Sequence, residues 1–143
     1  MSGKGKGIYK TMVIGIINGI MLGLAMKLVE MFFGMKVYTL LLEVDFLPVI
    51  GSFPWGEKTL FLFHLLLSIA ITYSYAHIII PFKDFRGRNE YVLAFLTITP
   101  AVLLYFPLSA WSKAGTPLPS DISAFSVWAC LHLFYALSLP KAI

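Results

Sequence analysis

The chain has 143 residues, of which 59% are hydrophobic and 13% are charged, about half of the charged fraction that is usual for a globular protein. Its net charge of +4 does not indicate nucleic-acid binding, because the basic residues stand in short clusters between apolar segments, where they orient a membrane protein. Cys130 is the only cysteine, which excludes an internal disulfide and a cysteine-ligated metal site. The composition predicts an all-α integral membrane protein.

Four apolar segments, at 8–33, 59–82, 91–111 and 121–140, are each long enough to cross a bilayer as a helix. We expect these four transmembrane helices to form a bundle within a single membrane domain, residues 1–143. Residues 1–7, in which glycine and lysine alternate from Gly3 to Gly7, are predicted to be a mobile basic tail. No A-x-A-type cleavage site follows this basic start, so the first segment is predicted to be a retained helix rather than a signal peptide.

The first segment carries Gly15, Gly19 and Gly23 at intervals of four, a spacing that lets another helix pack closely. At 100° per residue, Lys27 and Glu30 lie about 40° and about 20° from Gly23, so they continue the glycine face. Two interpretations of this pair remain open. It is either an anchor at the outer end of the helix, with a lysine that reaches the boundary, or a buried pair that binds or relays an ion.

The connection at 34–58 is too apolar for free exposure to water and too broken by proline and glycine to span the membrane. It is predicted to be an outer interfacial segment, either an amphipathic helix lying at the interface or a lid folded over the mouth of the bundle. Its acidic residues, Glu43, Asp45 and Glu57, are candidates for collecting cations or protons there. Solvated loop charge is the commoner explanation of such residues.

The second segment places His64, Ser68, Thr72 and Tyr75 within about 80° of one another on one helical face. These groups either hydrogen-bond to neighbouring helices or form a polar track in which His64 titrates. A cytoplasmic loop is predicted at 83–90.

In the third segment Pro100 is predicted to kink the helix. An outer loop at 112–120 follows, and Ser120 or Asp121 is suited to cap the last helix. His132 lies near the middle of that helix, about eight residues deeper than His64, or ~12 Å of helical rise. Because axial ligands of one haem need similar depth, neither haem nor any other cofactor or metal is predicted.

The lysine and arginine residues predict the orientation. Seven of them fall on one side of the predicted membrane, which is assigned as cytoplasmic: Lys4, Lys6, Lys10, Lys83, Arg86, Arg88 and Lys141. Both termini are therefore expected inside the cell.

Four short stretches follow one another along the chain: "KLVE" at 27–30, "FHLLLSIAITYSY" at 63–75, "FPL" and "GTPLP" within 106–119, and "VWACLH" at 127–132. This order resembles the YagU-like family of bacterial inner-membrane proteins. The glycine-rich first span, the proline-containing outer stretch and "GEKT" at 56–59 resemble the YqhR-like family of spore-forming Gram-positive bacteria. The YagU-like resemblance implies an envelope-stress or pH-homeostasis role and supplies no catalytic residues.

The leading hypothesis is a small, non-enzymatic component of the bacterial cytoplasmic (inner) membrane, related to envelope stress. It would contact membrane lipids and act as a homo-oligomer or as a subunit of a larger complex, with the glycine face, Lys27 and Glu30 as its packing surface. The alternative is a minimal transporter of protons, ions or small solutes that uses Glu30, His64 and His132. A third hypothesis, a lipid-modifying enzyme, would need Asp45, Glu57 and His64 to meet at the outer interface.

Overall fold

The structure is a computed structural model that describes residues 2–45, 47–82, 89–113 and 115–143. Within these residues it is helical and contains no strand. Four helical stretches are long and apolar enough to cross a membrane, Gly7–Phe33, Glu57–Ile79, Glu90–Trp111 and Ile122–Ala142. The prediction of four apolar helices is therefore confirmed.

The first long helix, α1, runs from Ser2 to Phe33, and the short helix α2 follows at Val37–Leu41. A single 3₁₀ turn, η1, covers Ile50–Ser52. The second long stretch is α3, Glu57–Ser74, which continues into a π-helical turn, η2 (Tyr75–Ile79), and a 3₁₀ turn, η3 (Ile80–Phe82). The remaining helices are α5 at Glu90–Leu103, α6 at Tyr105–Trp111 and α7 at Ile122–Ala142.

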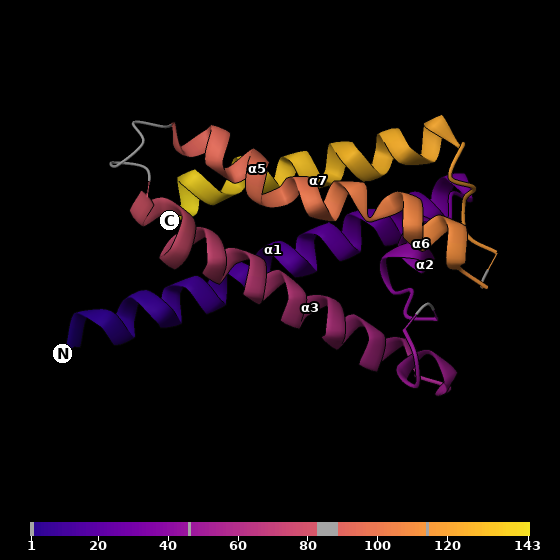
Figure 1. The fold of residues 1–143 in the computed structure, drawn as a ribbon, viewed down its shortest axis with the longest axis horizontal. Helices are drawn as coiled ribbons and strands as arrows, with labels where there is room; N and C mark the ends of the chain where they lie inside the picture. Colours follow the sequence, from indigo (N-terminus) through magenta and orange to yellow (C-terminus); the bar gives the residue numbers. More distant parts are fainter. Residues whose placement is uncertain (1, 46, 83–88, 114) are drawn as a thin grey trace.

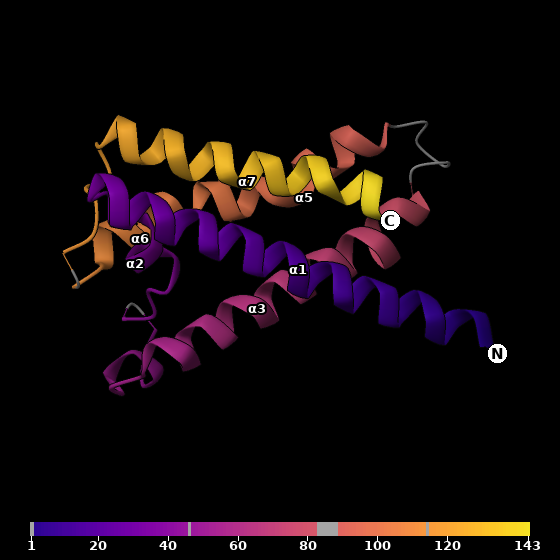
Figure 2. The ribbon, with the colours of Figure 1, turned by 180° about the vertical axis from the view of Figure 1, so that it is seen from behind.

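The helices pack as two pairs, α1 with α3 and α5 with α7, and α1 also contacts α7. Figure 1 shows α1 and α3 crossing obliquely, while α5 and α7 run side by side in opposite directions. Both chain termini lie at one end of the molecule, and α2 and α6 lie at the other, as Figure 2 shows from behind. We refer to the end that holds α2 as the α2 end.

The helix α1 begins earlier than the sequence analysis predicts, because residues 2–7, expected to be a mobile tail, continue it. A helix that has formed in the apolar segment extends at low cost, since each added residue contributes one more backbone hydrogen bond. Thr11 also donates its hydroxyl to the carbonyl of Gly7 at 2.8 Å.

The third apolar stretch is interrupted at Leu104, between α5 and α6. The helix α5 continues through Pro100, and the kink predicted there stays a prediction. The interruption lies next to Leu103, whose carbonyl is four residues before Pro107 and would clash with the proline ring in a regular helix. Pro81 has the same relation to His77, which lies in the π-helical turn η2.

The short helix α2 does not lie on the surface. Val37 and Leu40 are fully buried, and α2 contacts α1, α6 and α7. The choice for the 34–58 segment between an interfacial helix and a lid folded over the mouth of the bundle stays a prediction. The following turn is more exposed, with Val49, Ile50 and Phe53 all accessible on the surface.

Candidate functional site

The glycine face of α1, formed by Gly15, Gly19 and Gly23, packs against α3 of the same chain. A Cβ atom added at Gly15 would lie 2.8 Å from the Cα atom of Ile69, and one added at Gly19 would lie 2.9 Å from Ser68. Glycine is therefore required for this close approach. Because α3 already covers the face, the glycines do not form a contact surface for another subunit.

Polar residues of α3 form hydrogen bonds to the backbone of α1 at this contact. His64, Ser68 and Thr72 are all buried on the inner face of α3. Ser68 Oγ donates to the carbonyl of Gly15 at 2.7 Å, and His64 Nε2 lies 3.0 Å from the carbonyl oxygen of Gly19. These bonds tie the side chains of α3 to the backbone of α1 where no side chain of α1 intervenes.

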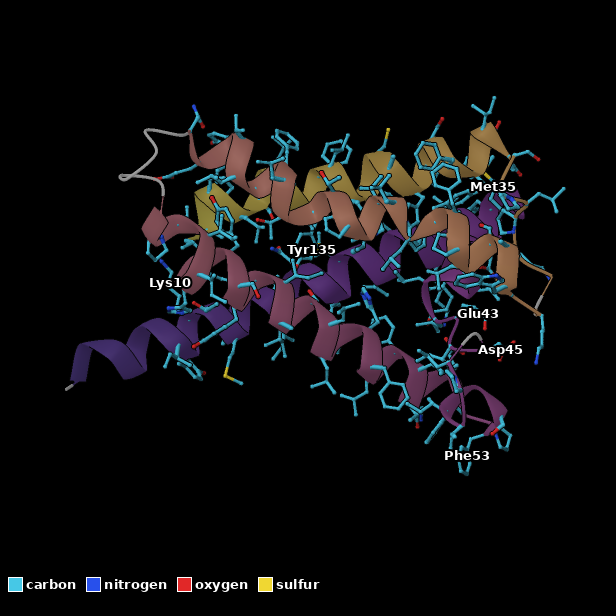
Figure 3. All side chains as sticks on the ribbon, in the orientation of Figure 1. Lys10, Met35, Glu43, Asp45, Phe53 and Tyr135 are labelled. Carbon is cyan, nitrogen blue, oxygen red and sulfur yellow. The ribbon has the colours of Figure 1, made fainter. Side chains whose placement is uncertain are left out.

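Tyr135 of α7 joins the same network. Its hydroxyl lies 2.8 Å from Ser68 Oγ and 2.7 Å from Thr72 Oγ1, and it donates to the carbonyl of Ser68 at 2.9 Å. Figure 3 shows Tyr135 in the middle of the molecule, between the two ends. We call Ser68, Thr72 and Tyr135 the central hydroxyl cluster. It connects α1, α3 and α7 through hydrogen bonds.

Tyr75, the fourth member of the predicted polar stripe, serves another contact. It is fully buried, and its hydroxyl donates to the carbonyl of Glu90 at 3.1 Å. This bond joins the end of the second apolar stretch to the first residue of α5. Tyr75 is therefore separate from the central hydroxyl cluster.

At the α2 end, Lys27 and Glu30 have different partners. Lys27 Nζ forms an ion pair with Glu57 Oε1 at 2.6 Å, with both side chains about half exposed. Glu30 accepts hydrogen bonds from the backbone N–H and the hydroxyl of Thr39, at 2.8 and 2.7 Å. The anchoring interpretation of Lys27 fits this geometry, with Glu57 rather than Glu30 as the partner. Glu30 instead holds α2 against α1.

Tyr38 of α2 completes the ion pair. Its hydroxyl donates to Glu57 Oε1 at 2.9 Å, and Lys27 Nζ lies 5.3 Å from the centre of its ring. Burial raises the pKa of Tyr38 from 10.0 to about 12, and the hydrogen bond to the Glu57 carboxylate acts in the same direction. Tyr38 therefore remains a hydrogen-bond donor at physiological pH.

Glu43 is a buried acidic side chain that links two segments at the α2 end. It is 8% exposed and accepts hydrogen bonds from the N–H of Asp45 at 2.8 Å and from the hydroxyl of Ser112. Ser112 follows α6, so Glu43 connects the 34–58 segment to the end of the third apolar stretch. Figure 3 shows Glu43 and Asp45 at the end opposite Lys10.

Two cavities adjoin at the α2 end. The outer pocket, of about 540 Å³, is lined by Lys27 and by all four predicted acidic residues of this end, Glu30, Glu43, Asp45 and Glu57. The inner cavity, of about 200 Å³, is mainly apolar and includes both His64 and His132 in its wall. Leu42, Glu43, Val44 and Leu60 line both spaces and separate them.

The structure brings His64 and His132 to the wall of one cavity. The difference in depth that residue counting predicts for them stays a prediction. His64 is not part of the outer pocket, where Asp45 and Glu57 lie. The three residues required by the lipid-modifying hypothesis therefore do not line one site.

Several residues at these sites were not identified from the sequence: Tyr38, Thr39, Ser112 and Tyr135. A signal existed for Tyr135, since Trp128, His132, Tyr135 and Leu139 recur at helical spacing and are all buried on α7. Nothing in the sequence pairs Tyr38 with Glu57 or Ser112 with Glu43, because these contacts depend on how the connecting segments fold.

Within the described ranges, no three His, Cys, Asp or Glu side chains form a group that could hold a metal ion. Comparisons with protein-family models, curated proteins and solved structures give no match for this chain. The YagU-like and YqhR-like resemblances therefore stay predictions.

Proposed function

We propose that this protein is a non-enzymatic accessory component of a bacterial cytoplasmic membrane, in which it acts as an oligomer or as a subunit of a larger complex. The observation that carries this proposal is the central hydroxyl cluster. Its members bond to one another and to the backbone of α1. Polar groups that form hydrogen bonds between helices hold those helices together in lipid, and they do not form a continuous path for ions or protons.

The proposed orientation is a four-helix bundle with both termini inside the cell. It is supported by the position of both termini at one end of the molecule (Figure 2) and by the basic residues near them. Reporter fusions at the two termini are expected to give the same cytoplasmic signal. Signals from opposite sides would contradict this topology.

Contacts with other subunits need a surface that α3 leaves uncovered. On α1, Ile17, Met21, Leu24 and Leu28 are each more than half exposed. Such a surface lies against lipid or against another membrane protein. Purification in mild detergent, followed by mass measurement and identification of copurified proteins, tests the proposal. A monomer that carries only lipid and detergent would contradict it.

The envelope-stress part of the proposal rests on the YagU-like resemblance. A strain that lacks the protein is expected to grow more slowly than its parent after an acid shift, and re-expression of the chain is expected to restore growth. Equal growth of both strains would remove this part and leave the accessory role intact.

A second candidate function is transport of protons, ions or small solutes. It is favoured by one observation, the apolar cavity with His64 and His132 that adjoins the acidic outer pocket. If this function holds, liposomes that contain the protein dissipate an imposed gradient faster than empty liposomes, and His64→Ala or Glu30→Gln abolishes the difference. Flux equal to that of empty liposomes excludes it.

A further inference from the structure

The inner cavity lies where α3 diverges from α5 and α6. Figure 1 shows these helices separating toward the α2 end, and the wall is formed by residues such as Leu67 of α3, Leu108 of α6 and Trp128 of α7. The volume of about 200 Å³ exceeds the roughly 150 Å³ of an apolar cavity that accommodates benzene. The space therefore fits an aromatic ring with a short substituent.

Two imidazole rings in this wall each have one nitrogen already bonded. His64 is 9% exposed and His132 is 4% exposed. His64 Nε2 lies 3.0 Å from the carbonyl oxygen of Gly19, and His132 Nδ1 lies 2.7 Å from that of Trp128. Because a carbonyl oxygen only accepts, each of these nitrogens donates its proton.

The bonded nitrogens fix the role of the other two. In a neutral imidazole only one nitrogen carries a proton, so His64 Nδ1 and His132 Nε2 are acceptors. Neither has a hydrogen-bond partner among the described residues. Both residues line the same mainly apolar cavity, and an acceptor without a partner in the protein suits a bound molecule that donates a hydrogen bond.

We infer that the inner cavity binds a membrane-soluble phenol-type molecule, with its apolar ring in the cavity and its hydroxyl group donating to His64 Nδ1 or His132 Nε2. The aromatic side chain of Trp128, whose ring centre lies 4.6 Å from that of His132, and Phe63 in the same wall suit an aromatic ring. This inference stands on the cavity and does not depend on the proposed function.

Other head groups fit less well. A ketone, ether or carboxylate has no proton to donate and would place lone pairs against those of the imidazoles. A cation would lose hydration in an apolar space. The carboxylate in the wall, Glu43, already accepts hydrogen bonds from Asp45 and Ser112. Water is the competing occupant, and the experiment below separates it from a phenol.

The test uses two probes that differ in one proton, a phenol that carries a photoreactive diazirine and its methyl ether. Each is added to the full chain in phosphatidylcholine vesicles, and labelled peptides are identified by mass spectrometry. The phenol is expected to label cavity-lining positions on α3, α6 and α7. The ether is expected to label them roughly fivefold less for each lost hydrogen bond. Excess 4-ethylphenol is expected to compete, and 4-ethylanisole is not.

Variants then assign the acceptors. The double variant His64→Phe/His132→Phe is expected to reduce labelling by the phenol roughly fivefold, and the single variant with the larger loss identifies the acceptor that the hydroxyl group uses. His77→Phe is the matched control, because His77 is exposed and lies outside the cavity wall. Equal labelling by phenol and ether, labelling without competition, or wild-type labelling of the double variant would overturn the inference. If a variant does not fold, the comparison of phenol and ether on the unaltered chain decides.

Discussion

Two faces of α3 have opposite character. Toward α1, the glycines let the backbones approach closely, and His64 and Ser68 bond to carbonyls of α1. Toward α5 and α6, large side chains such as Leu67 and Leu104 border a cavity. Small residues thus let polar groups find partners in the neighbouring backbone, whereas large residues hold the helices apart and leave acceptors unpaired.

Gly19→Leu is expected to destabilise the folded chain strongly, by about 1 to 3 kcal/mol or more. Its side chain would overlap Leu65 and Ser68, since a Cβ atom alone comes within 2.9 Å of both. Thermal unfolding in detergent measures the loss. Gly7→Leu is the matched control, because nothing lies within 4 Å of the added Cβ atom there. Equal melting temperatures of the two variants would refute the close packing of α1 on α3.

Tyr135→Phe is expected to cost about 1 kcal/mol. The substitution removes the hydroxyl that joins Ser68 and Thr72 and leaves the Thr72 hydroxyl without this buried partner. Tyr73→Phe serves as the control, because Tyr73 is 40% exposed. The same thermal assay compares them. A loss at Tyr73 as large as that at Tyr135 would show that the cluster has no special contribution.

Ionisation of Tyr38 is expected near pH 12, as its raised pKa requires. Its bond to Glu57 therefore contributes fully below pH 10 and is lost as the pH rises toward 12. The difference in tyrosinate absorbance between the wild type and Tyr38→Phe isolates this transition from the other tyrosines. A midpoint near pH 10 would mean that Tyr38 is solvated.

Double-mutant cycles distinguish the two possible partners of Lys27. Lys27→Met combined with Glu57→Gln is expected to show a small favourable coupling, because both side chains are about half exposed. Lys27→Met combined with Glu30→Gln is expected to show less, since Glu30 is bonded to Thr39. A stronger coupling to Glu30 than to Glu57 would show that Lys27 pairs with Glu30, as the sequence spacing suggests.

Much of the fold follows from the sequence by itself. The four apolar stretches, the buried face of His64, Ser68 and Thr72, and the cap at Asp121, which accepts from Ala124 N at 3.0 Å, all follow from hydropathy, helical period and local hydrogen bonding. Each of these depends on residues a few positions apart. Local sequence fixes such features because the helix geometry is the same wherever it occurs.

The partners of the charged and polar groups were decided by tertiary structure. Spacing along α1 places Lys27 beside Glu30, yet the fold pairs Lys27 with Glu57 and Glu30 with Thr39. The glycine face could have received any helix, and α3 of the same chain occupies it. The oblique path of α3 also brings His64 and His132 to one cavity. These outcomes depend on helix crossing and on the path of the 34–58 segment, for which the periodicity of single helices carries no information.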